Sequence, residues 1–245
     1  MQRCHASHTG LIHMTLRKWP MTNSSLTVLK ILGALAMLLD HYNSFLKADY
    51  SPLLYEMGRL AWPLFAFVLG YNLARIPTRQ LPHLMLRLLI FGILSTPLYN
   101  MLSGGLDHWW PLNILFTLLA ATTTVYLLSV PVPKHWNITV RLAGVLLFIA
   151  SGSLIDYFWI GSALVVVIWR LFTAVQAKER TLLNITLAVL VVLLCLLNDS
   201  LAALLAVPVI ALCRQTCQTI ALPRMKWFFY WFYPGHLLAL LVLSS

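Results

Sequence analysis

The sequence predicts an all-α protein, a polytopic bundle of about nine transmembrane helices with a cytoplasmic N-terminus, and three observations support this prediction. Hydrophobic residues make up 60% of the 245 residues and charged residues only 10%, whereas soluble domains have about 45–50% and 25%. Apolar stretches close to the length that a bilayer requires recur along the whole chain. Basic residues gather in alternate connections, as they do on the cytoplasmic side of polytopic proteins. These features exclude a soluble protein of one or two domains.

The apolar stretches define the helices that we expect. A membrane-spanning helix needs roughly 20 mainly apolar residues, and the shorter fifth, seventh and eighth stretches can instead be tilted, buried or partly re-entrant. The expected helices cover residues 26–46, 57–75, 84–102, 112–130, 141–156, 158–175, 182–197, 200–213 and 228–244. Proline and glycine mark several boundaries, such as Ser103-Gly104-Gly105 after the third stretch. We expect residues 1–25 to form a cytoplasmic tail and residues 26–245 a single transmembrane domain.

The distribution of charge sets the expected orientation. The chain has 17 Lys and Arg against 7 Asp and Glu, a formal net charge of +10. With the N-terminus inside, most basic residues fall on the cytoplasmic side, and only Lys47 and Arg59 fall outside. This dispersal along one membrane side explains the positive charge without nucleic-acid binding, which is not expected. The four cysteines form no CxxC pair, so neither a disulfide framework nor a zinc site is expected.

Asp40 and His41 lie in the outer third of the first expected helix. Ionisable side chains at membrane depth are costly and usually face a bundle interior or a water-filled cavity, which makes both residues functional candidates. Adjacent helix positions point about 100° apart, so Asp40 is expected to orient another group more readily than His41. Two interfacial polar residues that end a helix are an equally open alternative.

Three further polar residues are candidates with simple structural alternatives. Arg59 opens the second expected helix from the outside, where an arginine can also snorkel to the interface. Asn113 precedes an apolar run and can serve as a helix cap alone. Asp156 follows a stretch of small residues and can be an exposed loop acid.

His236 follows an aromatic run that begins at the inner interface, where Trp and Tyr are common without any function. At 1.5 Å per residue, His236 falls roughly at mid-membrane, just past Pro234-Gly235. We expect this pair to break the helix and free backbone groups toward a cavity. A satisfied structural histidine is the competing interpretation.

Five segments together resemble the TraX family, in order from about residue 26 to residue 244. They are Leu39-Asp40-His41, residues 58–67 (Gly-Arg-Leu-Ala-Trp-Pro-Leu-Phe-Ala-Phe), residues 113–118 (Asn-Ile-Leu-Phe-Thr-Leu), Asp156-Tyr157, and residues 228–237 (Phe-Phe-Tyr-Trp-Phe-Tyr-Pro-Gly-His-Leu). The resemblance implies a bacterial inner-membrane protein similar to the one that acetylates the N-terminus of F-type conjugative pilin. It also implies kinship with membrane acyltransferases that use cytosolic acetyl-CoA. Many family members carry an acidic Glu-Ile-Pro-Phe-Asp type stretch where this chain reads Thr96-Pro97-Leu98-Tyr99, so any role of those acids is absent or taken over here.

The resemblance leads to an expected mechanism of acetyl transfer. His41 is the expected general base toward an acceptor amine or hydroxyl, with Asp40, Asp156 or both holding the imidazole. Arg59 or Asn113 would donate to the thioester carbonyl oxygen. Direct transfer and a transient acetyl group on His41 or His236 both remain open. The basic residues expected to hold the CoA phosphates at the cytoplasmic mouth are Arg75, Arg79 and Arg87. No metal is expected.

Two other classes of function compete with this prediction. A transporter or channel would use Asp40, His41, Asp156 and His236 as a proton or ion relay. A non-catalytic assembly factor would hold pilin in the bilayer through helix packing. The acceptor also stays open, because family members in bacteria without such pili must act on another molecule, such as a glycan or lipid-linked sugar.

Overall fold

The computed structural model describes residues 19–46, 49–107, 109–217, 221–223 and 225–244, and these ranges contain helices but no strand. The expectation of an all-α fold is therefore confirmed, while residues 1–18 of the expected tail lie outside the described residues. The α-helices are α2 (Asn23–Phe45), α3 (Pro52–Gly58), α4 (Ala61–Arg75), α5 (Leu81–Ser103), α6 (Ile114–Ser129), α7 (Lys134–Gly152), α8 (Phe158–Thr173), α9 (Ala177–Leu197), α10 (Ala206–Thr216) and α11 (Lys226–Ser244). Two short 3₁₀ turns, η1 (Thr78–Gln80) and η2 (Ala202–Leu205), precede α5 and α10.

Local sequence signals explain where several helices begin and end. Thr22 caps α2 because its hydroxyl oxygen accepts the backbone N–H of Ser25 at 3.0 Å. Prolines occupy the first turns of α3 and α5, where the missing N–H has no helical partner to lose. Helix α5 ends at Gly104, whose φ of +137° suits glycine far better than a residue with a side chain.

Each of the nine apolar stretches in the sequence corresponds to a helical segment among the described residues. The second stretch is two helices, because the chain bends at Arg59 and Leu60 between α3 and α4. Within the described part of the chain, five segments are long and apolar enough to cross a membrane, namely Asn23–Phe45, Pro52–Arg75, Thr78–Ser103, Ala177–Leu197 and Trp227–Ser244. The apolar helices Ile114–Ser129, Phe158–Thr173 and Ala202–Thr216 are shorter. The chain is thus a helical membrane protein.

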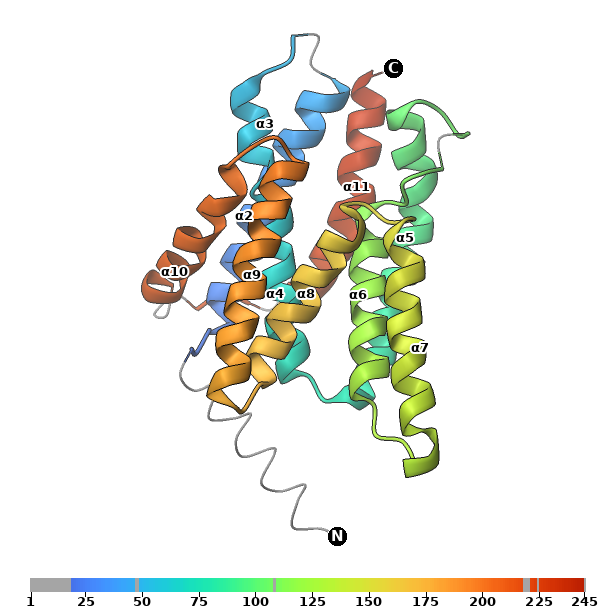
Figure 1. Ribbon diagram of the computed structural model, residues 1–245. Coiled ribbons are helices and arrows are strands. Elements are labelled where there is room, and N and C mark those ends of the chain that lie inside the picture. The colour runs from blue at the N-terminus through green and yellow to red at the C-terminus, as the bar shows by residue number, and fades with distance from the viewer. Residues whose placement is uncertain (1–18, 47–48, 108, 218–220, 224, 245) are drawn as a thin grey trace.

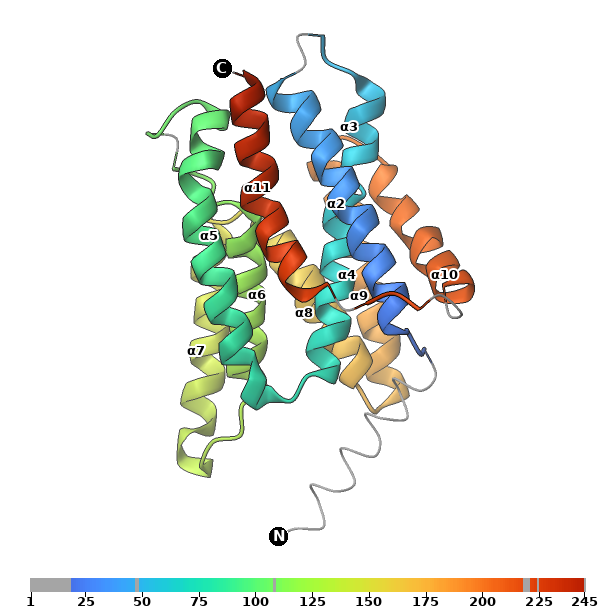
Figure 2. The same ribbon diagram turned by 180° about the vertical axis from the view of Figure 1, so that it is seen from behind.

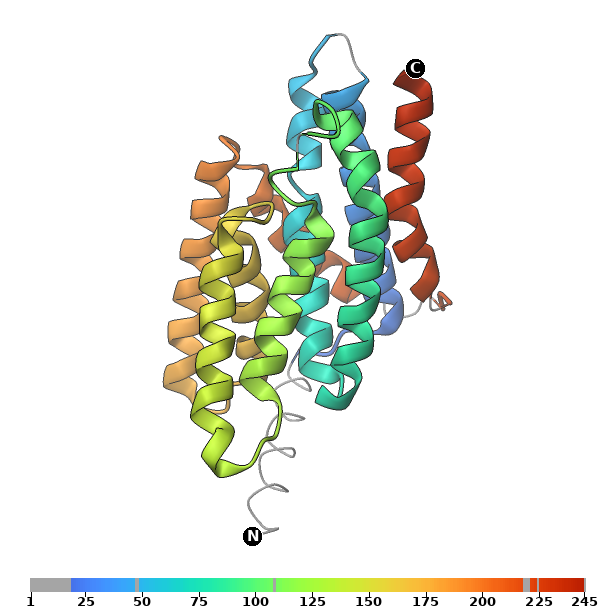
Figure 3. The same cartoon turned by 90° about the vertical axis from the view of Figure 1, so that its right-hand side faces the viewer.

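Six helices form a closed ring in which each packs against its two neighbours. The order around the ring is α2, α4, α8, α6, α5 and α11, and α11 returns to α2. Helices α7, α9 and α10 pack outside this ring, with α10 and α7 at opposite edges of the bundle (Figure 1; Figure 2 shows the reverse side). Viewed from the side, α11, α2 and α5 lie on one flank and α7, α8 and α9 on the other (Figure 3).

Small residues allow close contacts between helices of the ring, and apolar side chains cover the outside of the bundle. Gly70 of α4 lies against Ile168 of α8, so close that an added Cβ would stand 2.7 Å from the isoleucine side chain. Large apolar side chains remain exposed on the outer faces of α7 and α9, including Leu146 and Ile185. Exposed apolar surface of this kind is what lipid, rather than water, covers.

The expected break at Pro234-Gly235 is wrong, because α11 continues as one helix from Lys226 to Ser244 with Pro234 inside it. A proline inside a helix removes one backbone hydrogen bond, and membrane helices tolerate this when neighbouring helices surround the site. His236 is buried in this continuous helix, with 6% of its surface exposed.

The positive-inside pattern predicts which end of the bundle faces the cytoplasm. We expect a single cysteine at exposed Asp107, in a background without native cysteines, to react with an impermeant thiol reagent outside intact spheroplasts. A cysteine at exposed Lys178 should react only after lysis. The reverse labelling pattern would invert the orientation.

Candidate functional site

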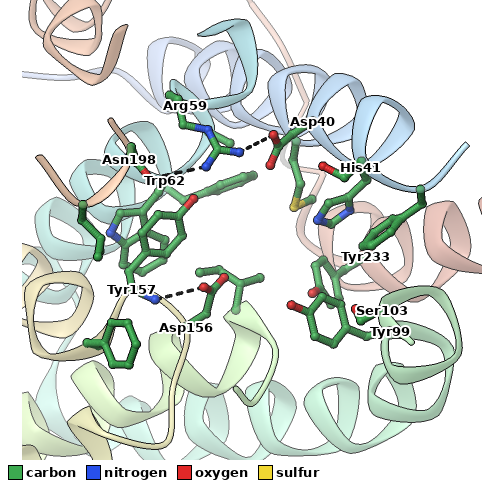
Figure 4. Close-up of a pocket in the computed structure, with 18 residues that line it drawn as sticks. Asp40, His41, Arg59, Trp62, Tyr99, Ser103, Asp156, Tyr157, Asn198 and Tyr233 are labelled. Atoms are coloured by element: carbon green, nitrogen blue, oxygen red, sulfur yellow. Dashed lines mark hydrogen bonds and ion pairs between the residues drawn. The ribbon is translucent and has the colours of Figure 1, made fainter. Parts of the chain in front are cut away.

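The ring encloses a cavity of about 410 Å³ at the end of the bundle where α2 and α5 finish and α6 begins. We call it the His41 cavity. Its wall combines polar side chains from α2, from the bend before α4, from the loop before α8 and from the end of α9. Figure 4 shows these side chains facing one another across the cavity. The polar residues in its lining are Asp40, His41, Ser44, Arg59, Trp62, Tyr99, Ser103, Asp156, Tyr157, Asn198 and Tyr233.

His41 is hydrogen-bonded to His236, which the sequence does not predict. Nδ1 of His41 lies 2.8 Å from Nε2 of His236, and the two rings lie edge to edge in nearly one plane, with an interplanar angle of 9° and centroids 5.1 Å apart. Nδ1 of His236 lies 2.9 Å from the carbonyl oxygen of Phe232. A carbonyl oxygen only accepts, so this Nδ1 carries the proton and Nε2 of a neutral His236 is an acceptor. His41 then donates from its own Nδ1, which leaves the Nε2 of a neutral His41 with a free lone pair.

The two histidines hold different positions relative to the cavity. His41 lines it, whereas His236 is not among the lining residues and stands behind His41. His236 is therefore placed to fix the tautomer and orientation of the His41 ring, as a second residue commonly does for a functional imidazole.

Asp40 forms an ion pair with the guanidinium of Arg59 rather than a contact with His41. Arg59 also donates from Nη1 to Oδ1 of Asn198 at 3.3 Å, and its guanidinium lies 4.3 Å from the ring centroid of Tyr55. Gly58 makes the ion pair possible, because a Cβ at that position would stand 2.5 Å from the Cβ of Asp40. Asp40 therefore orients the guanidinium of Arg59 rather than the ring of His41.

Asp156 lies across the cavity in the loop before α8 (Figure 4). Its backbone N–H donates to the carbonyl of Leu112 at 3.2 Å, and its own carbonyl accepts the hydroxyl of Thr117 at 2.9 Å. Its carboxylate accepts the backbone N–H of Tyr157 at 3.0 Å. Removal of this carboxylate from bulk water raises its pKa to about 6.

The loop after Asp156 has an unusual backbone. Tyr157 and Phe158 have φ values of +58° and +50°, in the left-handed region that residues with large side chains rarely adopt. Both line the cavity, and the Tyr157 ring stacks on Trp62 with centroids 5.3 Å apart. Backbone strain of this kind is concentrated at functional sites.

Asn113 has a structural position. Its side-chain oxygen caps α6 by accepting the N–H of Leu115 at 3.1 Å. Its amide nitrogen donates to the carbonyl of Gly92 at 3.0 Å and to the hydroxyl of Thr96 at 3.1 Å. These contacts use both amide hydrogens and one lone pair of the amide oxygen, and Asn113 does not line the His41 cavity.

Several lining residues were missed by the sequence analysis. Trp62 and Tyr233 lie inside two of the five segments that carry the family resemblance, but neither was singled out, and the aromatic run that contains Tyr233 is common at a membrane interface. Tyr99, the last residue of the stretch Thr96-Pro97-Leu98-Tyr99, lines the same cavity. Asn198 follows a plain apolar helix, and no local signal in the sequence marks it.

A second cavity, of about 640 Å³, lies toward the opposite ends of α4 and α11, and we call it the Arg75 cavity. Arg75 and Arg87 line it, together with Lys30 and His83, whereas Arg79 does not. The guanidinium of Arg87 lies 5.0 Å from the ring centroid of Trp227, and Arg75 lies 5.4 Å from that of Tyr71. Of the three arginines expected to hold the CoA phosphates, Arg75 and Arg87 thus line this cavity and Arg79 does not, while Lys30 adds a third cationic side chain to the wall.

The two cavities share part of their walls. Met37, Phe65, Ile114 and Tyr233 line both. The cavities are thus back to back inside the ring, one lined by Arg75, Arg87 and Lys30 and the other by His41. Among the described residues there is no cluster of three or more His, Cys, Asp or Glu side chains that could hold a metal ion.

The fold and the two cavities define a polytopic helical membrane protein with a polar chamber inside its helical ring. The family model for the TraX protein matches residues 25–244, and the chain belongs to the TraX family. The chain is similar to Protein TraX of Escherichia coli, with 31% identity over 226 residues that cover 89% of this chain and 86% of that relative. No solved structure matches the chain.

Proposed function

We propose that the protein is an integral membrane acetyltransferase, which moves acetyl from acetyl-CoA to an acceptor on the outer side of the bacterial inner membrane. One observation carries this proposal: the basic Arg75 cavity and the His41 cavity meet at a shared wall inside the ring. Such an arrangement suits a donor and an acceptor that arrive from opposite sides and react in between.

The Arg75 cavity suits the donor. CoA carries several phosphate charges, and Arg75, Arg87 and Lys30 place three cationic side chains on this cavity wall. The pantetheine arm is apolar in part and narrow. In this proposal it follows the cavity to the four shared residues, so that the thioester reaches the His41 cavity.

His41 is the proposed base. The hydrogen bond from its Nδ1 leaves Nε2 as the acceptor for a proton. The acceptor nitrogen forms a bond to the thioester carbon while its proton passes to His41 Nε2. The bond from this carbon to sulfur then breaks, and the protonated imidazole returns the proton to the leaving thiolate. The step consumes acetyl-CoA and releases CoA without a covalent acetyl-enzyme.

Tyr233 is the proposed donor to the thioester oxygen. It lines both cavities, and it is hydrogen-bonded to the backbone of Ile114, which also lines both, so its hydroxyl is at the junction that the thioester has to reach. Neither Arg59 nor Asn113 lines the Arg75 cavity. Asp156 is proposed to receive the acceptor amine, which arrives largely as an ammonium because a terminal amine has a pKa of about 8. This ammonium loses one proton through the Asp156 carboxylate to water, so that the neutral nitrogen attacks the thioester and its second proton passes to His41.

The proposed acceptor is the N-terminal amine of a conjugative pilin. Membership of the TraX family supports a role in conjugation. A buried cavity of about 410 Å³ has room for the terminal residue of a peptide rather than for a folded protein.

The assignment of the base predicts different behaviour for the two histidines. His41→Ala should lower kcat by about 10²–10⁴, the usual contribution of a general base, and leave membrane abundance and CoA binding normal. His236→Ala should lower kcat less, and His236→Gln should recover part of the loss because its amide oxygen can accept from His41 Nδ1. Acetyl transfer to a primary amine by purified protein measures both effects. Retention of a third of wild-type turnover by His41→Ala would exclude it as the base.

The donor site predicts an effect on KM. Arg75→Gln combined with Arg87→Gln should raise the KM for acetyl-CoA more than it lowers kcat, since the phosphates are remote from the reacting carbonyl. Arg79→Gln removes a charge from the same region but does not line the cavity, which makes it the matched control. Equal KM values in all three proteins would mean that these arginines set topology alone. A transporter would bind no CoA at all.

The proposed role of Asp156 predicts how kcat/KM for the acceptor falls at acidic pH. Its raised pKa of about 6 means that the carboxylate is ionised above that pH and protonated below it. If it holds the ammonium of the acceptor, kcat/KM for the acceptor should fall as the pH drops through about 6. Asp156→Asn should lower kcat/KM at neutral pH and remove this inflection. An unchanged inflection in the variant would assign it to another group.

A further inference from the structure

Hydrogen-bond donors without a partner are concentrated in the His41 cavity. Five buried side-chain N or O atoms among the described residues have no hydrogen-bond partner, and four of these belong to residues that line this cavity. Three of the four are N–H donors: Nε of Arg59, Nε1 of Trp62 and Nδ2 of Asn198. A buried donor that lacks a partner is costly, and native proteins retain few of them.

The contacts around these donors fix their orientation. The two terminal nitrogens of Arg59 are engaged by Asp40 and by Oδ1 of Asn198, which leaves Nε. Because Oδ1 of Asn198 accepts from Arg59, the Nδ2 end of the same amide points away from it. The Trp62 side chain is 1% exposed and stacked on Tyr157. The three groups lie on the same side of the cavity in Figure 4.

We propose that Arg59, Trp62 and Asn198 form a subsite for a carbonyl oxygen of the acceptor molecule. Three N–H donors without an acceptor among them suit an atom that only accepts, such as an oxygen with lone pairs, and do not suit an ammonium group. Asp40 already balances the charge of Arg59, and Asp156 adds a negative charge to the cavity. This balance favours a neutral carbonyl over a carboxylate.

The subsite belongs to the acceptor rather than to the donor. All three residues line the His41 cavity and none lines the Arg75 cavity, through which the thioester is proposed to arrive. This step rests on the proposed function.

Tyr157 connects the subsite to the proposed amine site. Its ring stacks on Trp62 at 5.3 Å between centroids, and its backbone N–H donates to the Asp156 carboxylate at 3.0 Å. An oxygen site and an amine site on two sides of one residue match an acceptor in which a primary amine and a carbonyl are close neighbours. The first residue of a polypeptide has this pattern, because its carbonyl carbon is two bonds from its α-nitrogen.

The test compares two small acceptors that differ by the carbonyl group. Alaninamide and isopropylamine both carry a primary amine on a branched carbon, but only alaninamide carries a carbonyl. The ratio of their kcat/KM values should fall about three- to tenfold in Trp62→Phe, which removes the N–H and keeps the ring. Asn198→Asp should lower the ratio similarly, because it keeps the acceptor for Arg59 and removes the donor. The different basicity of the two amines cancels when one ratio is compared between proteins.

A matched control separates the subsite from a general effect of losing an indole. Trp159 lies outside the cavity lining and donates its indole N–H to the carbonyl of Ile149 at 2.9 Å. Trp159→Phe should leave the ratio at its wild-type value. If Trp62→Phe fails to reach the membrane in normal amounts, Asn198→Asp decides the test.

A binding measurement decides the subsite even without transfer. Alaninamide should raise the Tm of the wild-type protein more than isopropylamine does, and Trp62→Phe should abolish that difference. An unchanged ratio and an unchanged Tm difference in both variants would overturn the subsite while leaving the acetyltransferase proposal intact. Absence of transfer to either amine, with the Tm difference present, would instead overturn the acetyltransferase proposal and support the subsite. Tighter binding of free alanine than of alaninamide would overturn the choice of a neutral carbonyl.

Discussion

The hydrogen bond between His41 and His236 is the interaction on which the proposed site depends. It joins α2 to α11, the first and last helices of the ring, at a distance of 2.8 Å between Nδ1 and Nε2. The carbonyl of Phe232 fixes the proton on His236 and thereby decides which nitrogen of His41 faces the cavity with a lone pair. The same contact therefore closes the ring and, in the proposed function, prepares the base. In a lipid environment a polar side chain needs such a partner within the protein, because no water is available outside.

The charged groups near these two histidines have hydrogen-bond or ion-pair partners of their own. Arg59 takes Asp40 as its partner at the bend between α3 and α4, which Gly58 allows by its lack of a Cβ. Asp156 is held by the backbone of its own loop on the far side of the cavity. Basic side chains that suit phosphates lie in the other cavity, behind four shared residues. In the proposed function, one ring of helices thus separates the base, the carboxylate that receives the amine and the cations that hold the donor.

Much of the fold could be predicted from the sequence because lipid imposes a simple rule of length and apolarity on each helix. All nine apolar stretches correspond to helical segments in the described residues, and Asp40, His41, Arg59 and Asp156 do line one cavity. The pairing of these residues could not be predicted, since His41 and His236 are 195 positions apart and Arg59 and Asn198 are 139 apart. The family resemblance makes Asn113 a candidate donor to the thioester oxygen, with a helix cap as the alternative, and in the structure its side chain caps α6. The helix continues through Pro234 because tertiary packing outweighs the local preference of proline.

Transfer between the two sides of a membrane tests the central claim most directly. The measurement uses the purified protein reconstituted into sealed liposomes, with labelled acetyl-CoA on one side and a peptide with a free N-terminal amine on the other. The proposed function, with its two cavities back to back, predicts that acetylated peptide appears on the side opposite the acetyl-CoA, while the CoA product stays where the donor was added. Acetylation only when donor and acceptor share a side, or none in either arrangement, would contradict the account.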